Sequence, residues 1–144
     1  MDEADRFQRE LKDILAAVDS GAKEASASAV KAGIDTGAKE WRKNIRERVG
    51  KAGSRTYRKH GKTYTIGAYS RSIRSHMLSV GDKPLGEVGS PKLPWLVHLL
   101  EKGHARVGGG RVRAIPHVAD AADAAFDAAV REAESDIERM LNGI

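Results

Sequence analysis

Apolar side chains recur at three- and four-residue steps over most of the first 49 residues, and this period constrains the fold more than any other feature of the sequence. The pattern starts at Phe7, is interrupted by small residues after Ser20, and resumes through Trp41 to Val49. Such spacing places the apolar side chains on one face of a helix. We therefore predict that residues 1–50 are helical.

Three glycines lie inside this pattern, at Gly21, Gly33 and Gly37. Each costs about 1 kcal/mol relative to alanine inside a helix. They indicate a kink, a break into two helices near Gly21, or close contact with another backbone. The small side chains between residues 21 and 38 favour close contact, because they bury little surface unless another element packs tightly against them.

The rest of the chain predicts a small antiparallel sheet and two more helices. Strand-forming residues surround turn sequences at His60-Gly61 and at Gly81-Asp82-Lys83-Pro84, which predicts two hairpins, over residues 56–66 and 72–89. A short helix is expected over residues 95–101, a glycine- and arginine-rich loop over 103–116, and a long helix over 117–141.

These elements predict an α+β fold in a single domain, residues 1–144. It would consist of a helical segment at 1–50, a basic hairpin at 54–67, and a sheet followed by the C-terminal helix in 68–144. Aromatic residues make up 5% of the chain, so the core of one copy would be thin. We expect some of the helical surface to become buried on assembly.

The net charge of +5 is unevenly distributed along the chain. Residues 51–76 carry seven Lys or Arg and no acid, whereas residues 117–144 carry two Arg and seven acids. This pattern can steer subunits onto one another, or steer the basic segment onto an external polyanion.

Other bulk features exclude several classes of protein. The chain contains no cysteine, which rules out disulfides and thiolate metal sites. No apolar run approaches the roughly 18–20 residues that span a bilayer, and the acidic N-terminus differs from the basic start of a signal peptide. We therefore expect a protein without membrane association that is made and used in the cytoplasm, or packed into a particle that is assembled there.

The candidate catalytic and metal-binding patterns are incomplete. A zinc peptidase needs two histidines four residues apart on one helical face, whereas His98 and His104 are six apart around Glu101. The segment Gly108-Gly109-Gly110-Arg111 lacks the Gly-Lys-Ser/Thr of a phosphate-binding loop. No nucleophile-elbow sequence surrounds the serines near His76. We therefore expect no enzyme activity, no metal and no cofactor.

The candidate interface residues are charged or aromatic. In the basic hairpin, cations alternate with Tyr57 and Tyr64, a pattern typical of surfaces that follow a nucleic-acid backbone. The same hairpin can instead be a solvated element, or a basic arm that docks on an acidic partner. The full candidate set is Arg55, Arg58, Lys59, Lys62, Trp95, Glu101, Arg106, Arg111, Arg113, Asp123, Asp127 and Glu134.

Residues 93–122 carry a family resemblance. Their two segments read Leu93-Pro94-Trp95-Leu96-Val97-His98-Leu99-Leu100-Glu101-Lys102-Gly103-His104 and Ile115-Pro116-His117-Val118-Ala119-Asp120-Ala121-Ala122. Together with the upstream arginine–serine segment Tyr69-Ser70-Arg71-Ser72-Ile73-Arg74, they resemble the head–tail joining family of long-tailed bacteriophages, also called tail-completion or neck proteins. Residues 68–141 are covered in order, and the basic hairpin at 54–67 resembles an insertion.

The resemblance implies a ring-forming structural protein without catalysis. Such a protein would be assembled in the host cytoplasm and would lie in the neck of the virion. Its partners would be copies of itself, in a ring of six or twelve, and other neck, portal-side and tail-tube proteins. DNA would pass through the ring with at most non-specific contact, and the basic segment 51–76 and the acidic segment 117–144 are candidate ring contacts.

Two other functions stay open at this point. One is a small DNA-binding accessory protein that uses the basic hairpin. The other is a different virion component, such as a tail terminator.

Overall fold

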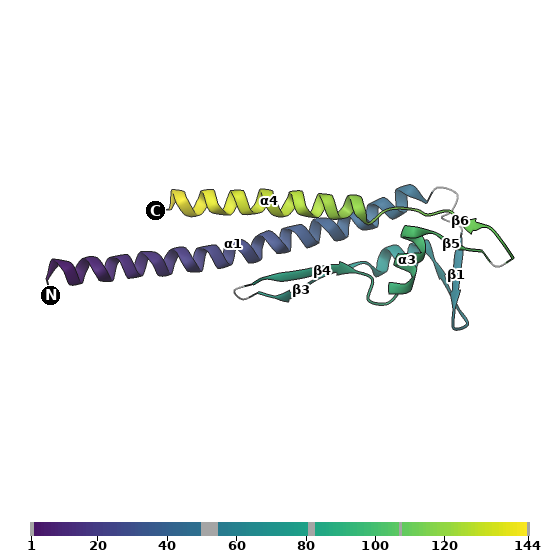
Figure 1. The fold of residues 1–144 in the computed structure, drawn as a ribbon, viewed down its shortest axis with the longest axis horizontal. Helices are drawn as coiled ribbons and strands as arrows, with labels where there is room; N and C mark the ends of the chain where they lie inside the picture. Colours follow the sequence, from purple (N-terminus) through teal and green to yellow (C-terminus); the bar gives the residue numbers. More distant parts are fainter. Residues whose placement is uncertain (1, 50–54, 81–82, 107, 144) are drawn as a thin grey trace.

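The computed structural model describes residues 2–49, 55–80, 83–106 and 108–143, and its fold is α+β, as the sequence predicts (Figure 1). Within these ranges, four helices and three two-stranded antiparallel sheets follow one another along the chain. Their bounds are α1 (Glu3–Arg48), β1 (Thr56–Lys59), β2 (Lys62–Thr65), α2 (Ile66–Ser72), β3 (Arg74–Ser79), β4 (Leu85–Gly89), α3 (Pro94–Lys102), β5 (His104–Ala105), β6 (Arg111–Val112) and α4 (Ala119–Asn142).

Helix α1 runs without a break from Glu3 to Arg48, so Gly21 does not divide it. The Asp2 carboxylate accepts the backbone N–H of Asp5 at 2.8 Å and caps the helix. Acidic side chains in the first turn and basic side chains in the last turn complement the helix dipole. The predicted end of the helical segment, residue 50, lies outside the described residues.

The glycines of α1 allow α4 to approach closely. A Cβ atom added at Gly33 would lie 3.0 Å from the carbonyl oxygen of Ala125 and 3.1 Å from Cβ of Ala129. A Cβ atom at Gly37 would lie 3.1 Å from Cβ of Ala125. The close-contact interpretation of the small residues is therefore confirmed.

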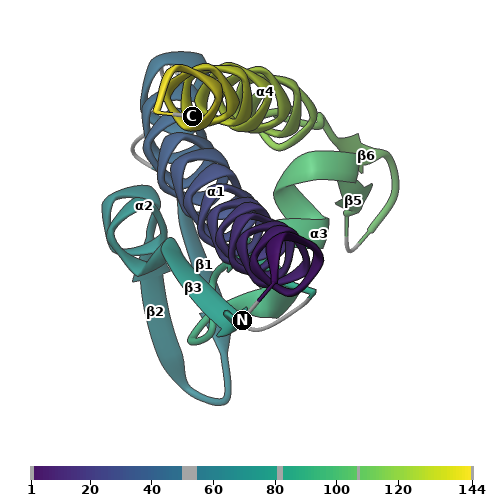
Figure 2. The same ribbon diagram turned by 90° about the vertical axis from the view of Figure 1, so that its left-hand side faces the viewer.

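Both predicted hairpins are present. In the first, β1 and β2 are joined by His60 and Gly61, whose positive φ angles of 52° and 76° suit a two-residue hairpin turn. The second, β3–β4, packs along α1, where a Cβ atom at Gly86 would come within 2.9 Å of Ile34. Its predicted turn includes residues 81–82, which lie outside the described residues. Hairpin β3–β4 and α4 cover different sides of α1 (Figures 1 and 2).

The core lies at the C-terminal end of α1, where the connecting elements gather around it. Its buried apolar side chains are Ala38, Trp41, Ile45, Ile66, Tyr69, Ile73, Leu93, Leu96, Leu100, Ile115 and Ala121. In the other direction, α1 continues past the end of α4 (Figure 1). Residues 3–17, which we call the overhang, are all exposed. The molecule is therefore elongated, with its core at one end.

Three local expectations need correction. The strand predicted through Ile66 ends at Thr65, and the Thr65 side chain caps the short helix α2, which no pattern indicated. The predicted loop over residues 103–116 contains the paired strands β5 and β6. The last helix begins at Ala119, two residues later than predicted.

The apolar stripe of the last helix is divided between two faces. Ala121 is buried and Ala125 and Ala129 are half-buried, and these small residues meet α1. The larger side chains remain exposed, and we call them the α4 stripe: Phe126, Val130, Ile137 and Leu141. Helical periodicity alone does not distinguish a face that packs inside the chain from a face that stays open.

We predict that alanine substitutions at two glycines of α1 change stability in opposite directions. At Gly21, the added Cβ would meet Sδ of Met140 at 2.8 Å, the far end of a flexible side chain. Helix propensity should then raise the free energy of unfolding by up to about 1 kcal/mol. At Gly33 the added Cβ would meet the backbone of α4. Gly33→Ala should therefore lower the free energy of unfolding by about 1–3 kcal/mol. Urea unfolding measures both, and equal stabilisation at the two positions would contradict the close contact.

Candidate interaction surfaces

The start of α4 is held by a side chain from α3. The Glu101 carboxylate accepts the backbone N–H groups of His117 and Val118, at 2.8 and 3.1 Å. A helix N-terminus favours a negative charge at this point, because its first N–H groups lack partners within the helix. Val118 at the N-cap has no side-chain acceptor of its own. Glu101, a predicted interface residue, thus lies inside the fold, with its side chain 16% exposed.

A buried chain of hydrogen bonds connects α1, α2 and the segment before α4. The indole N–H of Trp41 donates to the Tyr69 hydroxyl at 3.0 Å, and that hydroxyl lies 2.7 Å from Nε2 of His117. An indole nitrogen can only donate, so Tyr69 accepts from Trp41. A carbonyl oxygen can only accept, so Nδ1 of the neutral His117 ring donates to Ile115 and Nε2 accepts the Tyr69 proton. This network assigns the His117 proton to Nδ1, which lies 2.7 Å from the carbonyl oxygen of Ile115. We call these three side chains the polar chain.

Burial keeps the polar chain neutral. It lowers the pKa of His117, outweighing the carbonyl of Ile115 and the carboxylate of Glu101, which both act to raise that pKa. Burial also raises the pKa of the Tyr69 hydroxyl. No local pattern in the sequence indicates this network, because its members are separated by 28 and 48 positions.

The basic hairpin β1–β2 exposes its cations and turns its aromatic rings toward the fold. Its predicted interface residues Arg55, Arg58, Lys59 and Lys62 are all exposed. Tyr64 meets Trp95 edge-on with ring centres 5.7 Å apart, and Tyr57 meets His104 in the same way at 6.4 Å. Nζ of Lys59 lies 5.0 Å from the centre of the Trp95 ring. Trp95 therefore anchors the hairpin on α3, and both tyrosines are occupied by contacts within the chain.

Three more predicted cations lie at the same end of the molecule (Figure 1). Arg106, Arg111 and Arg113 are exposed on or beside strands β5 and β6. The turn between these strands contains residues 108–110, whose glycines all have positive φ. A groove of about 460 Å³ brings Arg113 together with Arg55 and with Arg48 of α1. One end of the molecule is therefore basic.

The predicted acids lie along α4. Asp123, Asp127 and Glu134 are all exposed, and α4 runs back along α1, away from the basic end (Figure 1). Asp120, in the first turn, instead pairs with Arg48 and belongs to the contact between the two helices. The structure therefore brings the predicted cations together at one end and places the acids elsewhere.

The overhang carries the beginning of the apolar stripe predicted for α1. Its large side chains are Phe7, Leu11, Ile14 and Leu15, with exposed fractions of 44–65%. At 1.5 Å per residue, the overhang extends about 22 Å. It is an amphipathic helix whose apolar face is open to solvent.

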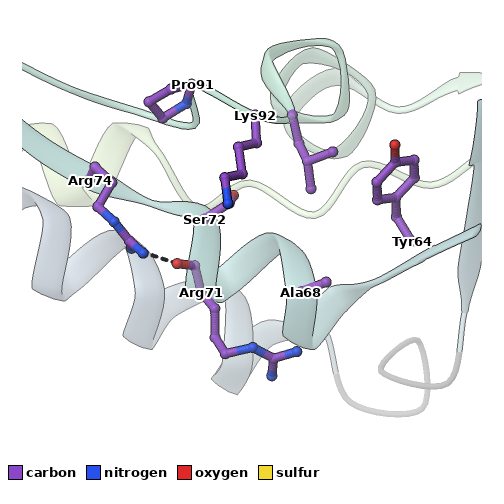
Figure 3. A pocket seen from close by; sticks show the side chains of 8 residues that line it. Tyr64, Ala68, Arg71, Ser72, Arg74, Pro91 and Lys92 are labelled. Carbon is purple, nitrogen blue, oxygen red and sulfur yellow. Dashed lines mark hydrogen bonds between the residues drawn. The ribbon is translucent and has the colours of Figure 1, made fainter.

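A cleft of about 370 Å³ lies beside α2 (Figure 3). Arg71, Arg74 and Lys92 contribute to its lining. The Arg74 guanidinium donates to the carbonyl oxygens of Arg71 and Ile73, at 2.6 and 2.9 Å, and the side chain of Arg71 extends away from Lys92 (Figure 3). The three cations do not converge, so the cleft lacks the geometry of a phosphate-binding site.

The three potential ligands around α3 have separate roles. His98 is exposed, Glu101 caps α4, and His104 lies against Tyr57. Across residues 2–49, 55–80, 83–106 and 108–143, no cluster of three or more His, Asp or Glu side chains is placed to hold a metal ion.

The sequence matches no protein-family model, and comparisons with curated proteins and with solved structures find no match. Among the helices that the structure describes, none combines the length and the apolar character needed to cross a membrane.

We predict that Glu101→Ala lowers the free energy of unfolding by about 1–3 kcal/mol, because it leaves two N–H groups at the start of α4 without an acceptor. The matched change Glu134→Ala removes an exposed acid and should alter stability by less than about 0.5 kcal/mol. Chemical denaturation measures both. Equal effects would mean that Glu101 does not hold α4 in place.

The polar chain predicts a loss of stability in mildly acidic solution. The pKa of His117 is lower in the folded protein than the value of about 6.5 expected in the unfolded chain. Below that pH, the unfolded chain binds a proton that the folded chain does not. Stability that is present above pH ~6.5 should therefore decrease as the pH falls toward the folded pKa, by at most about 1.4 kcal/mol per pH unit from this group.

The pKa itself can be measured by NMR titration of the His117 ring. A value above the ordinary histidine value would contradict the prediction. If the His117→Gln variant folds, its free energy of unfolding should depend less on pH over the same range than that of the wild type.

Proposed function

We propose that this chain is a structural subunit of the bacteriophage neck, which forms a ring with copies of itself between the DNA-filled capsid and the tail. The observation that carries the proposal is that large apolar side chains are exposed in three separate places. These are the overhang, the α4 stripe and the tip of hairpin β3–β4, where the exposed residues are Leu78, Val80 and Leu85. Apolar patches of this kind mark surfaces that other proteins cover.

The separation of charge supports the same function. A ring of identical subunits needs two different, complementary surfaces on each subunit. Here the cations of β1–β2 and β5–β6 are exposed at one end, and the acids of α4 are exposed elsewhere. Opposite charges on two surfaces guide subunits into one register as they meet. The overhang would then stay exposed in the ring, and a neighbouring protein above or below the ring would cover it.

The two segments that carry the family resemblance meet in space. The backbone N–H of Ile115 donates to the carbonyl oxygen of Leu100 at 2.7 Å, and Glu101 binds the N–H groups of His117 and Val118. The residues behind the resemblance thus hold one another in place within the fold.

The second candidate, a DNA-binding accessory protein, is favoured by the exposed cations at the basic end. Tyr57 and Tyr64 are packed against His104 and Trp95. The hairpin can therefore contact DNA through its charged groups but not through its aromatic rings. Binding would then be non-specific, and its affinity would fall steeply with added salt. A neck ring through which DNA passes can use the same cations in the same way.

The proposal is tested by electron microscopy of a lysate in which this gene is disrupted. DNA-filled heads lying apart from finished tails are the expected result. Normal infectious particles would contradict the proposed neck function and would favour the DNA-binding candidate.

We predict that Leu11→Glu fails to restore joined particles to that lysate, because it places a charge in the apolar face of the overhang. The matched control is Ala16→Glu, which adds the same charge on the far side of the helix, since five residues turn it by about 140°. Ala16→Glu should restore plaques normally. Equal complementation by the two variants would show that the overhang is not a contact surface.

A further inference from the structure

Two neighbouring hairpins give the basic end its exposed cations. Tyr57 of β1 meets His104 of β5 with ring centres 6.4 Å apart, so hairpins β1–β2 and β5–β6 lie side by side (Figure 1). Arg55, which precedes β1, and Arg113, which follows β6, line one groove. We call the exposed cations of the two hairpins and their flanks the basic surface: Arg55, Arg58, Lys59, Lys62, Arg106, Arg111 and Arg113.

Within the part of the chain that the structure describes, no carboxylate pairs with the basic surface. Residues 55–72 and 102–116 contain no Asp or Glu, and the ion pairs of the described residues all lie elsewhere. Of the acids that border this end, Glu101 caps α4 and Asp120 pairs with an arginine of α1. Exposed Glu47 lies in the last turn of α1, beside two arginines of that turn. An excess of positive charge therefore remains for a polyanion outside the chain.

The basic surface has no apolar centre among the described residues. The large exposed apolar side chains lie elsewhere, on the overhang, on α4 and on hairpin β3–β4. Contacts between proteins usually have an apolar centre that is depleted in charged residues. The backbone of a nucleic acid is instead bound mainly through its phosphate charge. The composition of this surface therefore favours a nucleic acid over an acidic protein.

The aromatic rings beside the basic surface are turned toward the fold. Proteins that hold single strands stack the bases on aromatic side chains. Here Tyr57 and Tyr64 are half-buried and meet His104 and Trp95. A duplex keeps its bases stacked on one another and presents one phosphate charge per ~1.7 Å of its axis. Cations without available rings therefore suit a duplex better than a single strand.

We infer that the basic surface binds the phosphate backbone of double-stranded DNA, and that both hairpins contribute to the binding. Within the described residues, no side-chain hydrogen bond or ion pair fixes any of its seven cations, so they meet phosphates as mobile charges and do not read the base sequence. The inference rests on the DNA contact that both proposed functions include, and extends it from one hairpin to two. The apolar surfaces that carry the neck proposal stay available for subunit contacts.

The binding can be measured by fluorescence anisotropy of a short labelled duplex, as the full chain is added at a series of salt concentrations. We expect the logarithm of the association constant to fall with the logarithm of the salt concentration with a slope of about −4 to −6, because each neutralised phosphate contributes about −0.9. Two duplexes of different sequence should bind within about threefold of each other, and a single strand of the same length should bind more weakly.

Two double variants test the contribution of each hairpin. Arg58→Gln with Lys62→Gln removes two charges from hairpin β1–β2, and Arg111→Gln with Arg113→Gln removes two from hairpin β5–β6. Each double variant should weaken duplex binding about tenfold or more at low salt, and should make the salt slope less steep by about 2. Circular dichroism checks that each variant is folded.

The matched control is Arg6→Gln with Arg131→Gln, which removes two exposed cations from the overhang and from α4. It lowers the net charge by the same amount as each hairpin variant, but should change the affinity for the duplex by less than about threefold. A control that weakens binding as much as the hairpin variants would overturn the inference, because net charge alone would then explain the binding.

Three other results would also overturn the inference. One is a wild type that does not bind the duplex at low salt. Another is tighter binding of the single strand, which would mean that the bases are contacted. A third is self-association in place of duplex binding, lost in both hairpin variants, which would assign the cations to the acids of another copy.

The gene-disruption lysate tests the neck function separately. Normal particles in that lysate would remove the neck function and leave the binding result intact. Separated heads and tails, together with a chain that does not bind the duplex, would remove only this inference.

Discussion

The contact between Glu101 and the start of α4 determines where that helix lies. Between residues 121 and 129, the face of α4 that meets α1 consists of alanines, which bury little apolar area each and so contribute little to holding the helix in place. The polar groups around residues 115–118 compensate for this. Besides Glu101, Asn44 donates to the carbonyl oxygen of His117 at 3.3 Å and Arg48 to that of Pro116 at 3.0 Å. The polar chain lies behind them and connects the same segment to α1 and α2. The geometry of α4 is therefore set at its first turn.

Close packing through small residues also decides what the chain exposes. Because glycines and alanines occupy the surface between α1 and α4, the larger apolar residues of α4 lie on a face that α1 does not cover. The same holds at the other end of α1, where the apolar stripe extends beyond the last turn of α4. The exposed apolar surface is thus a consequence of how the two helices meet. It is also unusual for a protein that functions as a single copy, since such proteins rarely leave large apolar patches open.

The sequence predicts the helices and hairpins well, because period and turn chemistry are local signals. The close approach at Gly33 and Gly37 could be inferred from the run of small residues. Helix α2 could not, because seven residues give too short a window for helical period and the strand-forming residues Thr63, Tyr64 and Thr65 directly precede it. Among the candidate interface residues, exposure was predictable for the cations and acids. The position of Glu101 was not, since its partners lie 16 and 17 residues away. The polar chain depends on tertiary contacts that no single segment encodes.

The separation of the core from the open surfaces has a further physical consequence. The buried side chains cluster at the C-terminal end of α1, while the overhang, the hairpin tip and the α4 stripe consist of exposed side chains on the outside of already formed elements. Substitutions at those surfaces remove few contacts within the chain, so they should change stability little. Those surfaces can therefore vary by sequence change while the fold is kept. In the proposed ring, a chain whose stability is concentrated at one end and whose exposed apolar surfaces lie along the rest would fold first and join its neighbours afterwards.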